Sequence, residues 1–122
     1  MKKVLVVDDE PGVRDMLVAV LEEEGYAVVA ASTGPRALEL LPREKPDLVL
    51  LDIMLPGVDG REVFRRMAEL PGIAAIPVIL MSAATRPNLA DQRAAAFLAK
   101  PFDLDDLLSQ VQRNIGGAPL TT

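Results

Sequence analysis

Three aspartates in this chain of 122 residues directly follow short runs of apolar residues. Asp8 and Asp9 come after the run at residues 4–7, and Asp52 comes after the run at residues 48–51. Short, continuous apolar runs are typical of buried parallel strands, and such sheets bind ligands outside the carboxyl ends of their strands. The three carboxylates are therefore expected to share one edge of the sheet. Their mutual repulsion would raise the pKa of at least one of them unless a cation bound between them. Hard oxygen ligands of this kind favour Mg²⁺.

Two further polar side chains follow apolar runs in the second half of the chain. Ser82 comes after residues 78–81, and Lys100 comes after residues 96–99 and precedes Pro101. A hydroxyl and an ammonium group are thus expected to face the three carboxylates. Taken singly, each residue has an ordinary explanation as a helix cap, a turn residue, a loop hydroxyl or a solvated charge. Placement of all five at strand ends would seldom arise by chance and indicates a common site, with an acid cluster, a metal ion and a reactive aspartate.

Composition excludes several other kinds of chemistry. The chain has neither Cys nor His, which excludes disulfides, thiolate or imidazole metal sites, and a phosphohistidine on this protein. Thirteen basic and 18 acidic residues give a net charge of -5, which argues against direct binding to nucleic acid. The apolar run after Met1-Lys2-Lys3 ends at two acids, unlike a signal peptide, and no stretch approaches membrane-spanning length. The expected location is the cytoplasm, with no membrane association.

The periodicity of apolar residues alternates along the chain between short runs and helical stripes, as expected for an α/β fold of repeated strand and helix units. The predicted strands are residues 3–7, 27–30, 48–51, 78–81 and 96–99. Residues 1–116 are expected to form one domain, and residues 117–122 a flexible tail or the stub of a linker.

Helix starts and stops are marked by proline, glycine and acidic residues. Pro11 opens the first helix, Pro35 the second and Asp59-Gly60 the third, and Asp103 caps the last. The last helix is predicted to bury five apolar residues, Leu104, Leu107, Leu108, Val111 and Ile115. The interval between Ser82 and Lys100 leaves room only for a shortened fourth helix, at about residues 89–95.

The combined pattern resembles the receiver domain of bacterial response regulators. The resemblance extends from Val4 to about Ile115 and is carried by the motifs V-L-V-V-D-D-E, P-D-L-V-L-L-D-I-M-L-P-G-V-D-G and A-K-P-F. It implies a flavodoxin-like (βα)₅ fold, a three-layer sandwich around a five-stranded parallel sheet in the order 2-1-3-4-5. It also implies a phosphorylation-activated switch of a two-component phosphorelay.

The resemblance assigns a role to each residue of the expected site. Asp52 would accept a phosphoryl group from a sensor histidine kinase or a phosphotransfer protein. Mg²⁺ would be held by Asp9 directly, Asp8 through water, Asp52, and the backbone carbonyl of Met54. Phosphoryl oxygens would be bound by Ser82, the backbone of Ala83, and Lys100, whose peptide bond to Pro101 would be cis. Ser82 and Phe97 would form the switch.

These roles are chemically coherent, because a carboxylate attacks phosphorus only if the charge on the phosphoryl oxygens is neutralised, as Mg²⁺ and Lys100 would do. The switch would control a downstream protein or a fused output domain, without turnover of an external substrate. The shortened fourth helix offers little dimer interface, so a monomer or weak dimer is expected. The alternative of a Mg²⁺-dependent aspartyl-phosphate phosphohydrolase usually requires a second acid two residues after Asp52, where this chain has Met54. A nucleotide-binding module is disfavoured because no glycine motif for a diphosphate is present.

Overall fold

The computed structural model describes residues 1–83 and 93–115. Along these residues the elements are β1 (Lys3–Val7), α1 (Pro11–Glu23), β2 (Ala27–Ala31), α2 (Gly34–Glu44), β3 (Leu48–Asp52), α3 (Gly60–Met67), β4 (Val78–Ser82), β5 (Ala96–Ala99) and α4 (Leu104–Asn114). Each strand lies within one residue of its prediction. The helix expected at about residues 89–95 falls largely on residues 84–92, outside the described part of the chain, as does the expected tail.

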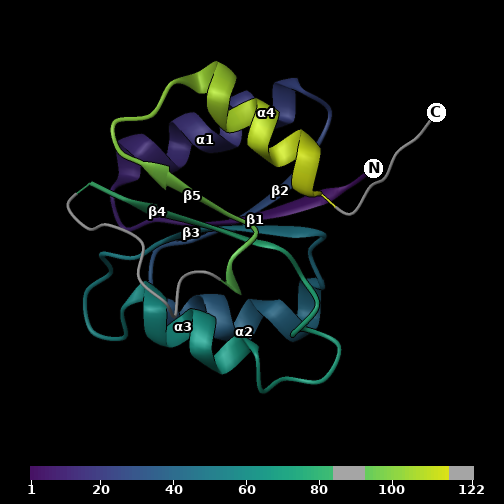
Figure 1. Cartoon of the computed structure of the whole chain (residues 1–122), viewed down its shortest axis with the longest axis vertical. Helices are drawn as coiled ribbons and strands as arrows, with labels where there is room; N and C mark the ends of the chain where they lie inside the picture. The colour runs from purple at the N-terminus through teal and green to yellow at the C-terminus, as the bar shows by residue number, and fades with distance from the viewer. Residues whose placement is uncertain (84–92, 116–122) are drawn as a thin grey trace.

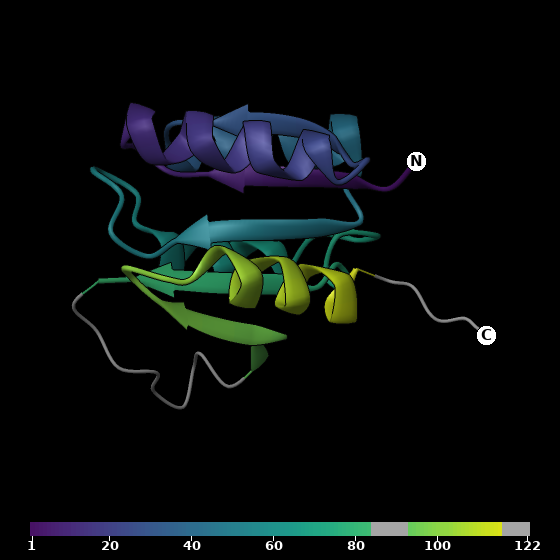
Figure 2. The same cartoon turned by 90° about the horizontal axis from the view of Figure 1, so that it is seen from above.

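The five strands form one parallel sheet in the order β2-β1-β3-β4-β5, which confirms the predicted flavodoxin-like topology. Figure 1 shows three layers, with α1 and α4 on one face of the sheet and α2 and α3 on the other. Seen from above in Figure 2, the strand arrows all point the same way. The residues that follow β1, β3, β4 and β5 therefore gather at one edge.

The core consists of two apolar clusters, one on each face of the sheet. Side chains alternate between the faces along a strand, so neighbouring residues of one strand belong to different clusters. In β1, for example, Leu5 and Val7 pack with α2 and α3, whereas Val4 and Val6 pack with α1 and α4. Burial on both faces explains why β1, β3 and β4 read as continuous apolar runs.

Two of the predicted helix starts have a side-chain cap. The carboxylate of Asp59 accepts a hydrogen bond from the Glu62 N–H at 3.0 Å, and Thr33 Oγ1 accepts one from the Arg36 N–H at 3.2 Å, before Pro35. Asp103 occupies the cap position of α4, although its side chain makes no capping hydrogen bond among the described residues. No helix in the described part of the chain is long and apolar enough to cross a membrane.

One burial prediction for the last helix was wrong. Leu104 is 40 % exposed, whereas Leu107, Val111 and Ile115 are buried as expected and Leu108 is partly buried against the same cluster. Side chains of a helix point back toward its N-terminus. The side chain of Leu104, the first residue of α4, therefore points beyond the start of the helix and not onto the sheet.

Candidate functional site

Two buried aspartates lie side by side at the carboxyl edge of the sheet. Asp52 is the last residue of β3, and Asp8 follows β1, the neighbouring strand. Asp8 is fully buried and Asp52 is 3 % exposed. The backbone holds both positions, because the Asp8 N–H donates to the carbonyl of Ala31 at 3.1 Å and the Ile53 N–H donates to the carbonyl of Met81 at 2.9 Å. Two carboxylates at such depth require compensating donors.

Lys100 supplies the main compensation, as the sequence predicted. Its ammonium Nζ lies 2.8 Å from Asp8 Oδ2 and 3.1 Å from Asp52 Oδ2, and its side chain is 12 % exposed. The peptide bond between Lys100 and Pro101 is cis, the expected conformation. Lys100 thus bridges two strands that are far apart in sequence through one charged group.

The second oxygen of each aspartate accepts a backbone N–H. The Glu10 N–H donates to Asp8 Oδ1 at 3.0 Å, and the Met54 N–H donates to Asp52 Oδ1 at 3.0 Å. Each carboxylate is therefore held by a backbone amide on one oxygen and by Lys100 on the other. These hydrogen bonds fix the orientation of both carboxylates.

The electrostatics of the pair are set by burial and by these hydrogen bonds. Burial raises the pKa of the Asp52 carboxyl and the charge of Asp8 adds to this, while the Met54 N–H and the Lys100 ammonium oppose it. For Lys100, burial alone would lower the pKa. The hydrogen bonds to Asp8 and Asp52, together with their charges, outweigh burial and raise the pKa of Lys100. Lys100 is therefore a cation at neutral pH. It lies beside Asp52, whose ionised form is disfavoured by burial.

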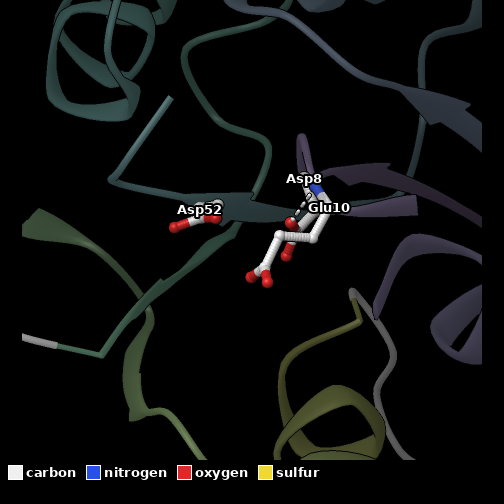
Figure 3. A group of neighbouring side chains, drawn as sticks. All are labelled: Asp8, Glu10 and Asp52. Atoms are coloured by element: carbon white, nitrogen blue, oxygen red, sulfur yellow. Dashed lines mark hydrogen bonds between the residues drawn. The ribbon is translucent and has the colours of Figure 1, made fainter. Parts of the chain in front are cut away.

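A third carboxylate comes close to this pair. Among the described residues, Asp8, Glu10 and Asp52 each offer an oxygen atom within 4.8 Å of the others, and Figure 3 shows these side chains together. Lys100 Nζ lies 3.6 Å from Glu10 Oε1. A set of carboxylate oxygens at this spacing suits a hard divalent cation.

The membership of this group differs from the sequence expectation. Asp9 is exposed and is not part of the group, whereas Glu10, which was not among the expected site residues, belongs to it. Glu10 is the cap residue before Pro11 and has an extended backbone, with φ -85° and ψ 114°. A residue before proline is restricted to such conformations, so the sequence predicts the extended backbone of Glu10 but not its place beside Asp8 and Asp52.

The remaining predicted residues lie on β4 and β5. Ser82 ends β4 and is 1 % exposed, and its carbonyl accepts a hydrogen bond from the Lys100 N–H at 2.8 Å. Ala83 is exposed beside it. Phe97 lies on β5 opposite Leu80 and is partly buried against the core on the α2 and α3 face. Ser82 and Phe97 thus occupy neighbouring strands, and their role as a switch stays a prediction.

Comparisons with known proteins agree on one family. The family model described as the response regulator receiver domain matches residues 4–112 of this chain. Sporulation initiation phosphotransferase F of Bacillus subtilis is 38 % identical over 116 residues, covering 92 % of each protein.

Solved structures give the same result. The response regulator TrrA of Thermotoga maritima, solved in complex with Mg²⁺ and BeF, has a TM-score of 0.85 at 36 % identity. The match covers 93 % of this chain and 98 % of that one. The receiver domain of the sensor histidine kinase PA1611 of Pseudomonas aeruginosa, solved with a magnesium ion in its active-site cleft, has a TM-score of 0.86 at 28 % identity. That match covers 95 % of this chain and 98 % of the other. With its sheet order and its acidic strand-end site, the chain belongs to the response regulator receiver domain family.

Proposed function

We propose that Asp52 is the phosphoacceptor of this receiver domain. The observation that carries the proposal is the buried Asp52 carboxylate, fixed at the end of β3 between the Met54 N–H and the Lys100 ammonium. One carboxylate oxygen attacks phosphorus, the bond from phosphorus to the donor nitrogen breaks, and an acyl phosphate forms on Asp52. Positioning and charge neutralisation dominate this kind of transfer, and the site is organised for both.

Lys100 has two successive partners in this proposal. It holds Asp52 Oδ2 before transfer and moves to the phosphoryl oxygens during transfer. Its departure frees Oδ2 as the nucleophile, while the Met54 N–H keeps Oδ1 in place. The hydroxyl of Ser82 and the backbone of Ala83 bind the other phosphoryl oxygens.

We assign Mg²⁺ as the cofactor, which Asp52, the carbonyl of Met54, Asp9 and, through water, Asp8 would hold. Bound there, it would neutralise charge on the transferring group. The acidic group of Asp8, Glu10 and Asp52 supports the presence of a cation, as do the related structures that contain magnesium. Glu10 is the second candidate for the position assigned to Asp9, because its carboxylate already lies at the site.

The phosphodonor is a sensor histidine kinase or a phosphotransfer protein, as the names of the relatives support. A pocket of about 340 Å³ borders Lys100 and is lined largely by Val13, Met16, Pro101 and Phe102. We place the donor's histidine-bearing segment there, since this apolar surface borders Lys100, which contacts the proposed nucleophile. The output partner or fused output domain, the cytoplasmic location and the monomer or weak dimer stay predictions.

Receiver domains are signalling switches and not classical enzymes of substrate turnover, and the alternative of a phosphohydrolase is not favoured. Incubation with Mg²⁺ and acetyl phosphate tests this choice. We expect close to one acid-stable phosphate per chain, and release of inorganic phosphate no faster than decay of that adduct. Many turnovers per chain without an accumulating phosphoprotein would indicate a phosphohydrolase instead.

A further inference from the structure

The loop of residues 53–59, between β3 and α3, carries Met54 and is fixed at its base. The Gly60 N–H donates to the carbonyl of Ile53 at 2.9 Å, which closes the loop. The side chains of Ile53 and Leu55 are buried in the core on the α2 and α3 face, whereas Met54 between them is 58 % exposed. The backbone of Met54 is therefore held from both sides, although its own side chain contributes little.

Close packing at Gly60 leaves no space for a side chain at the base of the loop. A Cβ atom at this position would collide with the carbonyl oxygen of Asp52 and would lie 2.7 Å from Ile53 Cα. These are backbone atoms, which cannot rotate away as the end of a flexible side chain can. The start of α3 thus rests directly on the backbone of the proposed phosphoacceptor.

The far end of the loop, at Val58, also packs closely against another element, α2, which lies beside α3 (Figure 1). A Cβ atom at Gly34, the first residue of α2, would lie 2.5 Å from the carbonyl oxygen of Val58 and 2.9 Å from Val63 Cγ2. Gly34 has no positive φ, so its backbone does not require glycine. The requirement comes from the space that the loop occupies.

We infer that Gly34 is a positioning residue for the metal site, acting through the loop of residues 53–59. Its missing side chain lets the loop lie against α2, and the loop in turn places the carbonyl of Met54. The inference rests on the proposed function, because it takes Met54 as a metal ligand. By linkage, if Gly34 affects Mg²⁺ binding through the loop, Mg²⁺ bound at Met54 must in turn stabilise the first turn of α2.

The test is Gly34→Ala, with Mg²⁺ affinity measured by titration calorimetry and the rate of phosphorylation by acetyl phosphate followed at rising Mg²⁺. Residues that orient metal ligands typically change affinity by 10- to 100-fold, and we expect a loss of about tenfold here. The phosphorylation rate should recover at saturating Mg²⁺, because the nucleophile is intact. An unchanged affinity, or a rate defect that Mg²⁺ does not relieve, would overturn the inference.

Two control variants separate positioning from stability. Gly12→Ala is the matched substitution in the first turn of α1, where a Cβ atom meets nothing within 4 Å. Leu21→Ala leaves a cavity in the core on the other face of the sheet and lowers stability without touching the loop. Both should keep the Mg²⁺ affinity of the wild type. A loss of affinity in Leu21→Ala equal to that in Gly34→Ala would assign the effect to stability alone and refute the inference.

Hydrogen exchange in the wild type decides the matter even if Gly34→Ala does not fold. Mg²⁺ should slow exchange of the Arg36 and Ala37 amides, which bond to Thr33 in the first turn of α2 and lie outside the proposed ligand set. Unchanged exchange at these amides at saturating Mg²⁺ would refute the coupling. Failure of the wild type to bind Mg²⁺ and to be phosphorylated would instead contradict the proposed function.

Discussion

Asp52→Asn is expected to abolish phosphorylation by acetyl phosphate while leaving the fold intact. The amide has no nucleophilic oxygen of comparable strength, yet its Oδ1 atom can still accept the hydrogen bond from the Met54 N–H, while Nδ2 replaces the oxygen that Lys100 contacts. Incorporation of phosphate is measured by intact-protein mass spectrometry, and the fold by circular dichroism. Phosphate entering this variant at the rate of the wild type would refute the assignment of the phosphoacceptor.

The same variant should be no less stable than the wild type at neutral pH in the absence of metal. Burial raises the pKa of Asp52, so its ionisation costs folding free energy above the pKa of the unfolded chain. Removing that charge returns about 1.4 kcal/mol for each pKa unit of the shift. Asp59→Asn is the matched control, because Asn caps a helix as well as Asp and this residue lies in the same loop outside the acidic group. It should be phosphorylated as fast as the wild type.

The second large effect concerns magnesium, which is expected to raise the melting temperature of the wild type. The carboxylates of the two buried aspartates share one ammonium group, that of Lys100. A further cation that binds the folded state and not the unfolded chain therefore adds stability. At ten times its dissociation constant the ion contributes about 1.4 kcal/mol. For a domain of this size that corresponds to a shift of roughly 3–8 °C, measured by thermal scans in Mg²⁺ and in chelator.

Variants of the acidic residues then identify the ligands. We expect Asp9→Ala and Asp52→Asn to remove most of the shift, and Asp15→Ala, an exposed acid on α1, to keep it. Loss of the shift in Glu10→Ala but not in Asp9→Ala would transfer the direct ligand position to Glu10. Survival of the full shift in both Asp9→Ala and Asp52→Asn would place the metal elsewhere and contradict the assignment.

Much of the fold was predictable because its signals are local. The apolar runs before Asp8 and Asp52 mark strands buried on both faces, and those strands end where predicted to within one residue. Parallel strands with a shared carboxyl edge then bring Asp8, Asp52 and Lys100 together without further information. The starts of α2 near Pro35 and of α3 at Asp59-Gly60 were likewise predicted to within one residue.

The rest depends on directions and distances that local patterns do not contain. Glu10 has the same residue type and position as a helix-start acid, and only the turn before Pro11 brings it to the acidic group. Leu104 fits the apolar stripe of α4 but points past the start of the helix. The contact at Gly34 joins segments that are distant in sequence, and the contact at Gly60 depends on how the loop of residues 53–59 folds back, so neither glycine could be distinguished from an ordinary helix-start residue.

Reductive trapping of the phosphorylated wild type tests the central claim most directly. An acyl phosphate on an aspartate is reduced by borohydride to homoserine, which tandem mass spectrometry locates in the sequence. After reaction with acetyl phosphate and Mg²⁺, we expect homoserine at Asp52 alone, in an amount that matches the phosphate incorporated. Homoserine at Asp8 or Asp9, or a phosphoprotein that leaves Asp52 unmodified, would contradict the account.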